Sequence, residues 1–137
     1  MTARARKMQR ILAVQQQLHK IAQWRLTDLH TRLEQLTADQ RDLIAALNED
    51  EALQGLFIDG MARRLQSLAD AASKTAEETQ VQSVRLLEQA GRLACAERTA
   101  AAADLAALRA DERKGLLETI ERLADSGSQA SRKIVAR

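Results

Sequence analysis

Apolar residues recur at alternating intervals of four and three between positions 22 and 47. The series is Ala22, Leu26, Leu29, Leu33, Leu36, Gln40, Leu43 and Leu47. This spacing places one apolar seam along a single face of a helix and is typical of a coiled coil. Because one helix cannot bury such a seam alone, the pattern predicts a partner helix.

A second apolar stripe runs beside this seam near the start of the chain. The main seam continues backwards through Met8, Leu12, Gln15 and His19, of which the last two are polar. The second stripe consists of Ile11, Val14, Leu18 and Ile21. The eleven-residue step from Ile11 to Ala22 predicts a stutter that locally straightens the supercoil. The apolar face is therefore wider here than one partner helix needs.

Trp24 lies outside the main seam and close to Ile21 in the helical pattern. Two interpretations stay open for this side chain. It can be a tolerated surface residue, half covered by the stems of its neighbours. It can also be a contact for another protein, because tryptophan is enriched among the residues that dominate binding at interfaces.

Residues that weaken helices gather between positions 48 and 60. Asn48 and Glu51 have the spacing of a capping box, and Gly55 and Gly60 disfavour helix. The pattern predicts helix one at about 4–48, a bend at about 48–60 and helix two at about 56–125. The run from Ser126 to Ser128 is expected to end helix two and leave a basic tail at 126–137.

Helix two carries its own seam, which weakens in the middle. Its members are Ile58, Met61, Leu65, Leu68, Ala72, Thr75, Thr79, Gln82, Leu86 and Leu93. Alanine then dominates over 94–110, and a further stripe follows at Leu105, Leu108, Leu116, Ile120 and Leu123. Because a short connection favours antiparallel neighbours, the chain is predicted to be all-α, a single long antiparallel two-helix coiled-coil hairpin over 1–137.

The hairpin also predicts a register. Folding about residue 53 makes the numbers of facing residues sum to about 106, so Met8 should face about Arg98. Residues after about 105 then have no partner in helix one. The apolar side chains at this open end are where we expect partners to bind.

Composition changes little in this picture. The chain has no proline, 1% aromatic residues and a formal net charge of +2, with basic clusters only near its two ends. Its single cysteine excludes an internal disulfide and fits a reducing compartment, and Cys95 among alanines is expected to be a small packed thiol. No apolar run approaches the roughly 20 residues of a membrane span. A cytoplasmic protein without membrane insertion is expected.

Signatures of enzymes are missing from the sequence. It contains no glycine-rich phosphate loop and no paired cysteine motif. His19 and His30 lie three helical turns apart, too far to share one metal ion. The carboxylates are scattered at the spacing of a solvated helix face. The sequence therefore predicts a protein that is not an enzyme, with no catalytic residue, cofactor or metal site.

Three stretches resemble the FliJ family of flagellar export proteins and its type III secretion relatives of the YscO kind. They are RKMQRIL at 6–12, QQLHKIAQWRLTDLHTRLEQL at 16–36 and GLFIDGMARRLQSL at 55–68. The resemblance implies a hairpin similar to the central stalk of rotary ATP synthases. It also implies insertion into a hexameric export ATPase ring and contacts with an export gate and escort chaperones, at the periphery of a membrane-embedded export machine.

Two functions follow from these features: an export stalk, or a self-associating structural scaffold. A nucleic-acid accessory role is disfavoured by the near-neutral charge and by the lack of aromatic residues on which bases could stack. The predicted partner-binding residues lie at the basic start, in the second stripe and on the unpartnered end of helix two. They are Arg6, Lys7, Arg10, Ile11, Val14, Leu18, Ile21, Trp24, Leu116, Ile120 and Leu123.

Overall fold

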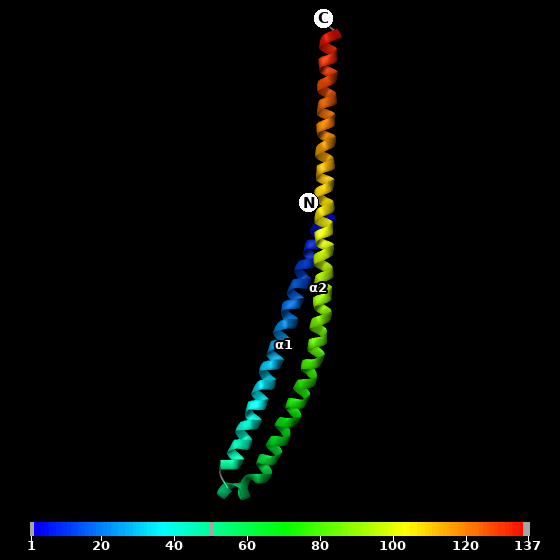
Figure 1. Ribbon diagram of the computed structural model, residues 1–137. Helices are drawn as coiled ribbons and strands as arrows, with labels where there is room; N and C mark the ends of the chain where they lie inside the picture. Colours follow the sequence, from blue (N-terminus) through cyan, green and yellow to red (C-terminus); the bar gives the residue numbers. More distant parts are fainter. Residues whose placement is uncertain (1, 50, 136–137) are drawn as a thin grey trace. The chain divides into compact units, whose positions relative to one another are not determined.

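The computed structural model describes residues 2–49 and 51–135, and the side chains of 2–49 and 58–135. The chain is all-α, with α1 at Ala3–Glu49 and α2 at Glu51–Val135. The two helices pack against each other as a helical hairpin, which confirms the predicted fold class (Figure 1). Within the described residues, neither helix has a stretch long and apolar enough to cross a bilayer.

The second helix is longer than predicted. α1 passes each of its predicted ends by one residue, whereas α2 begins at Glu51 and continues to Val135. The prediction that the run from Ser126 to Ser128 ends the helix is wrong. A glycine inside a helix costs only about 1 kcal/mol relative to alanine, and each further residue adds a backbone hydrogen bond. Without a proline, Gly60 and Gly127 do not interrupt α2.

The connection between the helices is also shorter than the predicted bend at 48–60. Asn48 lies inside the last turn of α1, so it is not the N-cap of α2, and the predicted capping box is wrong. The backbone is helical through Glu49 and again from Glu51. Residue 50 and the side chains of 51–57 lie outside the described residues.

Contacts within the hairpin group the residues into two compact units. Unit 1 contains residues 1–14 and 94–137, and unit 2 contains residues 15–93. Each unit has its own packing between a piece of α1 and a piece of α2.

Unit 2 has the predicted seam. From α1 it contains Gln15, His19, Ala22, Leu26, Leu29, Leu33, Leu36, Gln40, Leu43 and Leu47, all half-buried. From α2 it contains Met61, Leu65, Leu68, Ala72, Thr75, Thr79, Gln82, Leu86, Gln89 and Leu93, all buried or half-buried. Ile58 is 52% exposed, so its predicted place in the seam is wrong. Because Gln15, His19 and Ala22 keep the three–four spacing, the predicted stutter is also wrong.

Polar side chains occupy the part of the unit 2 seam that lies farthest from the connection between the helices. Gln89 Nε2 donates a hydrogen bond to Gln15 Oε1 at 2.7 Å, and Gln82 Nε2 donates to the Ala22 carbonyl at 3.3 Å. Both glutamines of α2 are buried. In each pair the residue numbers sum to 104, close to the predicted 106. The register of unit 2 therefore agrees with the one expected from the sequence.

Unit 1 is packed through alanines. Ala5 of α1 is fully buried against Ala103 and Ala107 of α2, and Met8 packs against this cluster. Gln9 Nε2 donates to Asp104 Oδ2 at 2.8 Å across the same pair of helices. The predicted pairing of Met8 with Arg98 is therefore wrong. Arg98 itself is exposed.

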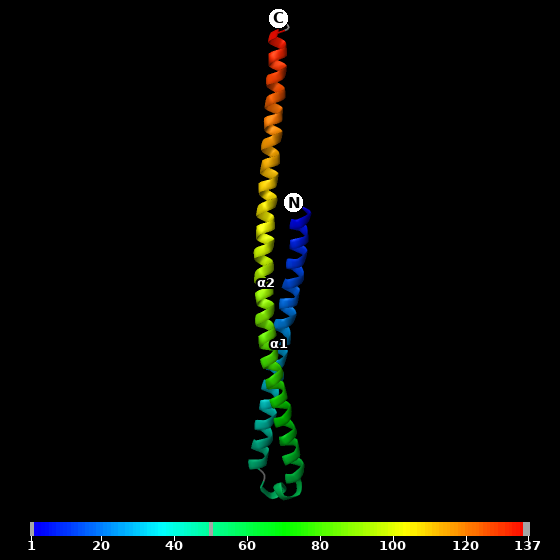
Figure 2. The same cartoon turned by 90° about the vertical axis from the view of Figure 1, so that its right-hand side faces the viewer.

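α2 continues in unit 1 beyond the start of α1. Figure 2 shows the blue start of α1 beside the yellow part of α2, with the orange and red part of α2 running on past it. Every described residue of α2 from 108 to 135 is exposed. At 1.5 Å per residue this segment is about 40 Å long. We call residues 108–135 the overhang.

Candidate partner-binding surface

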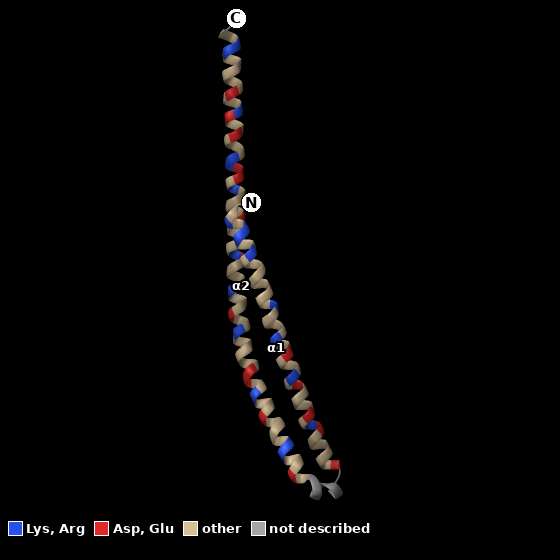
Figure 3. Cartoon of the chain, turned by 180° about the vertical axis from the view of Figure 1, so that it is seen from behind, with Lys and Arg blue, Asp and Glu red and all other residues tan. Residues whose placement is uncertain are grey.

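The basic start of α1 is exposed in unit 1. Arg6, Lys7 and Arg10 point away from the alanine cluster, and Figure 3 shows basic residues gathered at this end of α1. Ile11 and Val14 follow them and are 39% and 57% exposed. This part of the predicted surface therefore mixes cationic and apolar side chains, as a surface for an acidic protein partner would.

The overhang presents the predicted apolar residues to solvent. Leu116, Ile120 and Leu123 are 64%, 60% and 67% exposed, and their spacing places them on one face of α2. Leu117 extends this face and is 60% exposed. Neighbouring residues therefore cover less than half of each of these side chains.

The remaining predicted residues lie on α1 in unit 2. Leu18 and Ile21 are 43% and 40% exposed, at the edge of the polar seam. Trp24 is 69% exposed, which is more than the half-covered side chain of the first interpretation. An exposed indole of this size fits a tolerated surface residue as well as a contact for another protein, and binding experiments distinguish the two.

Leu18 and Ile21 line a groove between α1 and α2 that the sequence did not predict. Its charged lining is Arg25 of α1 with Arg85, Glu88 and Arg92 of α2, and its floor is Ala22, Gln82 and Gln89. We call it the arginine groove. The sequence carried a usable signal, because Leu18 and Arg25 lie seven residues apart, as do Arg85 and Arg92. A seven-residue repeat beside a seam marks one flank of a coiled coil.

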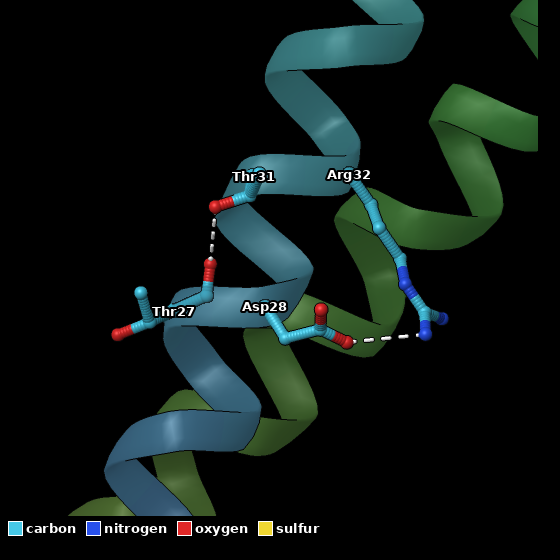
Figure 4. Close-up of polar contacts among 4 residues, drawn as sticks. All are labelled: Thr27, Asp28, Thr31 and Arg32. Atoms are coloured by element: carbon cyan, nitrogen blue, oxygen red, sulfur yellow. Dashed lines mark hydrogen bonds and ion pairs between the residues drawn. The ribbon is translucent and has the colours of Figure 1, made fainter.

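Away from these surfaces, α1 is an ordinary solvated helix. Arg32 pairs with Asp28 one turn earlier at 3.1 Å, and Thr31 Oγ1 donates to the Thr27 carbonyl at 3.0 Å (Figure 4). The two charged side chains are 65% and 61% exposed. Contacts of this kind contribute a few tenths of a kcal/mol to a helix and form no site.

The histidines and the cysteine are not brought together. His19 is half-buried in the seam, with no partner for its Nδ1 among the described residues, whereas His30 is exposed. Cys95 is exposed, so its prediction as a packed thiol is wrong: the next residue, Ala96, occupies the seam instead. In residues 2–49 and 58–135, no three His, Cys, Asp or Glu side chains are grouped as metal ligands.

Comparisons of the chain with protein families, with curated proteins and with solved structures found no match. Of the resemblance to FliJ-like proteins, the structure supports the antiparallel two-helix hairpin. The coiled-coil character is shared by many helical proteins, so the export role is a separate question.

Proposed function

We propose that this chain is a non-enzymatic coiled-coil stalk of a flagellar or type III protein export apparatus. It would act in the cytoplasm beside the export machine and bind an export ATPase ring and an export gate. The observation that carries the proposal is the overhang, whose apolar face has no partner within the described part of unit 1. Exposed apolar surface of this extent usually marks a protein–protein contact.

Two further features support a docking role. The cationic residues Arg6, Lys7 and Arg10 lie beside exposed Ile11 and Val14, which suits an acidic surface such as the lumen of a ring. The three stretches that resemble FliJ-like proteins agree with the same role.

The test is binding of the purified chain to the export ATPase and to the export gate protein of its own organism. Replacing Ile21 and Trp24 together by alanine should weaken binding about tenfold or more and leave the melting temperature unchanged. Leu87→Ala is the matched control, because it removes a 74% exposed apolar side chain from another face.

Two results would contradict the proposal. If neither the ATPase nor the gate protein binds the wild-type chain, the stalk function is wrong. If binding persists in the Ile21→Ala, Trp24→Ala variant while the melting temperature falls, these residues belong to the packing of the hairpin and not to a partner site.

A self-associating structural scaffold is the second candidate. It is favoured by the exposed apolar side chains found in each of the two units, because a second copy offers surface of the same kind. A scaffold would sediment as a stable oligomer and would bind neither the ATPase nor the gate.

A further inference from the structure

The overhang carries a seam of its own. Its members follow one another at alternating intervals of four and three residues, and all of them are exposed: Arg109, Arg113, Leu116, Ile120, Leu123, Gly127, Ala130 and Ile134. We call these residues the outer stripe. Such spacing keeps one line of side chains facing a neighbouring helix along the whole segment. The outer stripe therefore fits a helix as its partner.

α1 does not cover the outer stripe, because it packs on the other side of α2. Ala107, which is buried against Ala5, lies nine residues before Leu116. Nine residues are about two and a half helical turns, so the two side chains point to opposite sides of α2. The four large apolar members are 64%, 60%, 67% and 77% exposed: Leu116, Ile120, Leu123 and Ile134. A helix that covers them therefore comes from another molecule.

The outer stripe is complementary to its own reverse. When two overhangs lie antiparallel and the numbers of facing residues sum to 243, residues 108–135 overlap over their full length. Every member of the outer stripe then faces another member. Ile120 faces Leu123 of the second copy, and Leu116 faces Gly127, so the large apolar side chains meet at the centre of the contact. The arginines of the stripe face Ile134 and Ala130 towards its two ends.

Charged residues beside the stripe agree with this register. Glu112 and Lys133 each come directly before a member of the outer stripe, so both lie at the same edge of it. Like edges meet in an antiparallel pair, which places Glu112 of each copy beside Lys133 of the other. A shift of the register by seven residues in either direction separates these two charges.

A parallel arrangement of two overhangs is disfavoured by charge. It would place Arg109 and Arg113 of one copy directly against the same two arginines of the other. Like charges facing each other oppose association, whereas the antiparallel arrangement sets each arginine opposite an uncharged residue.

We propose that the overhangs of two copies of this chain pair in this antiparallel register and form a two-fold symmetric dimer through residues 108–135. The contact buries apolar side chains that are exposed in the single chain. Because both copies offer the same surface, the contact is isologous and closes at two copies. The dimer needs no other protein, so the inference does not rest on the export role. A partner that binds the overhang would compete with the second copy.

Sedimentation equilibrium of the full chain over a range of concentrations tests the dimer. The wild type should change from monomer to dimer as the concentration rises. Ile120→Asp should weaken association about tenfold or more, because the dimer would place two carboxylates against leucines. Leu87→Asp is the matched control, since it makes the same kind of change at a 74% exposed position outside the overhang. Circular dichroism should show that both variants remain helical.

Exchange of the two edge charges tests the register. Glu112→Lys alone and Lys133→Glu alone should each weaken association about threefold or more, because each variant brings like charges together twice in the dimer. A chain with both substitutions should associate like the wild type, because both pairs are then attractive again. Glu118→Lys is the control: Glu118 lies two residues after Leu116 and therefore points to the other side of α2.

Three results would overturn the proposal. They are a wild-type chain that stays monomeric at every concentration, association that Ile120→Asp leaves unchanged, and a doubly exchanged chain that fails to recover. Binding to the export ATPase and to the gate protein is measured separately, so a missing dimer leaves the export proposal standing.

Discussion

At the scale of single residues, the seam is less apolar than its spacing suggests. No large side chain is fully buried among the described residues, and Thr79, Gln82 and Gln89 are among the most buried positions. Their hydrogen bonds run to the helix backbone or to another glutamine. A seam of half-buried and polar side chains holds the helices together, but each residue contributes little to the free energy of unfolding.

Gln82→Leu should therefore raise the melting temperature. The change loses one hydrogen bond to the Ala22 carbonyl, worth about 1 kcal/mol, and buries a leucine, worth about 1.5–3 kcal/mol. Thermal unfolding followed by circular dichroism measures the difference. Gln80→Leu, at an exposed position of the same helix, should change it little. A lower melting temperature for Gln82→Leu would mean that the glutamine fits this site better than a leucine.

Leu33→Asp should have the opposite effect. Leu33 is half-buried at the centre of the unit 2 seam, so the substitution removes an apolar contact and places a charge there. Truncating a fully buried leucine costs about 2–5 kcal/mol, and this partly exposed one should cost nearer the lower value. Ala45→Asp adds the same charge at an exposed position of α1 and is the control. An unchanged melting curve for Leu33→Asp would exclude this seam.

At the scale of elements, the alanines of α2 give unit 1 its packing. The alanine-rich stretch 94–110 predicts a stable helix, because alanine is the best helix former. The sequence does not say which of these alanines face α1, because they stand on every side of the helix. Ala100, Ala103 and Ala107 are buried, at intervals of three and four, whereas Ala101 and Ala102 are exposed. The close approach depends on small side chains at the buried positions.

Ala103→Leu should release the start of α1 from α2. Overpacking a well-filled contact costs about 1–3 kcal/mol, and here the cost falls on the packing of Ala5 and Met8. Hydrogen–deuterium exchange should become faster over residues 3–14 and stay unchanged over 26–47. Ala101→Leu is the matched control on the exposed face. Equal protection of 3–14 in both variants would show that the alanine cluster does not hold this helix start.

Deleting residues 126–137 should lower helicity without lowering the melting temperature. The described residues of this segment are helical and exposed, so their removal shortens α2 but takes away no packing contact. Far-ultraviolet circular dichroism should fall in proportion to the residues removed. A clear drop in melting temperature would instead show that the segment stabilises the hairpin.

At the scale of the whole molecule, the hairpin was predictable because two seams with coiled-coil spacing need each other. The register of unit 1 was not predictable, because a run of alanines can pack against α1 almost equally well in several registers. The two ends of α2 were also predicted wrongly, because the helix begins earlier and ends later than expected. A glycine weakens a helix by only about 1 kcal/mol, which the residues around it can offset.

The candidate partner-binding surface likewise has a part that the sequence predicted and a part that it did not. The apolar residues of the second stripe and of the overhang could be found from their spacing, and they are exposed. The arginine groove was missed, although the seven-residue spacing of Arg85 and Arg92 is visible in the sequence. That spacing marks one flank of α2, but it does not say that Arg25 of α1 lies on the same groove, because the two helices come together there only in the folded register.

The exposure of Trp24 has an optical consequence. The chain contains one tryptophan and no tyrosine, so its fluorescence above the weak phenylalanine signal comes from a single indole. With 69% of that residue exposed, the emission of the free protein should be close to that of an indole in water. Any molecule that covers this part of α1 will shift the emission to shorter wavelengths, and one that binds only at a distance will not. The hairpin thus reports, without a label, whether a partner sits on this part of α1 or elsewhere.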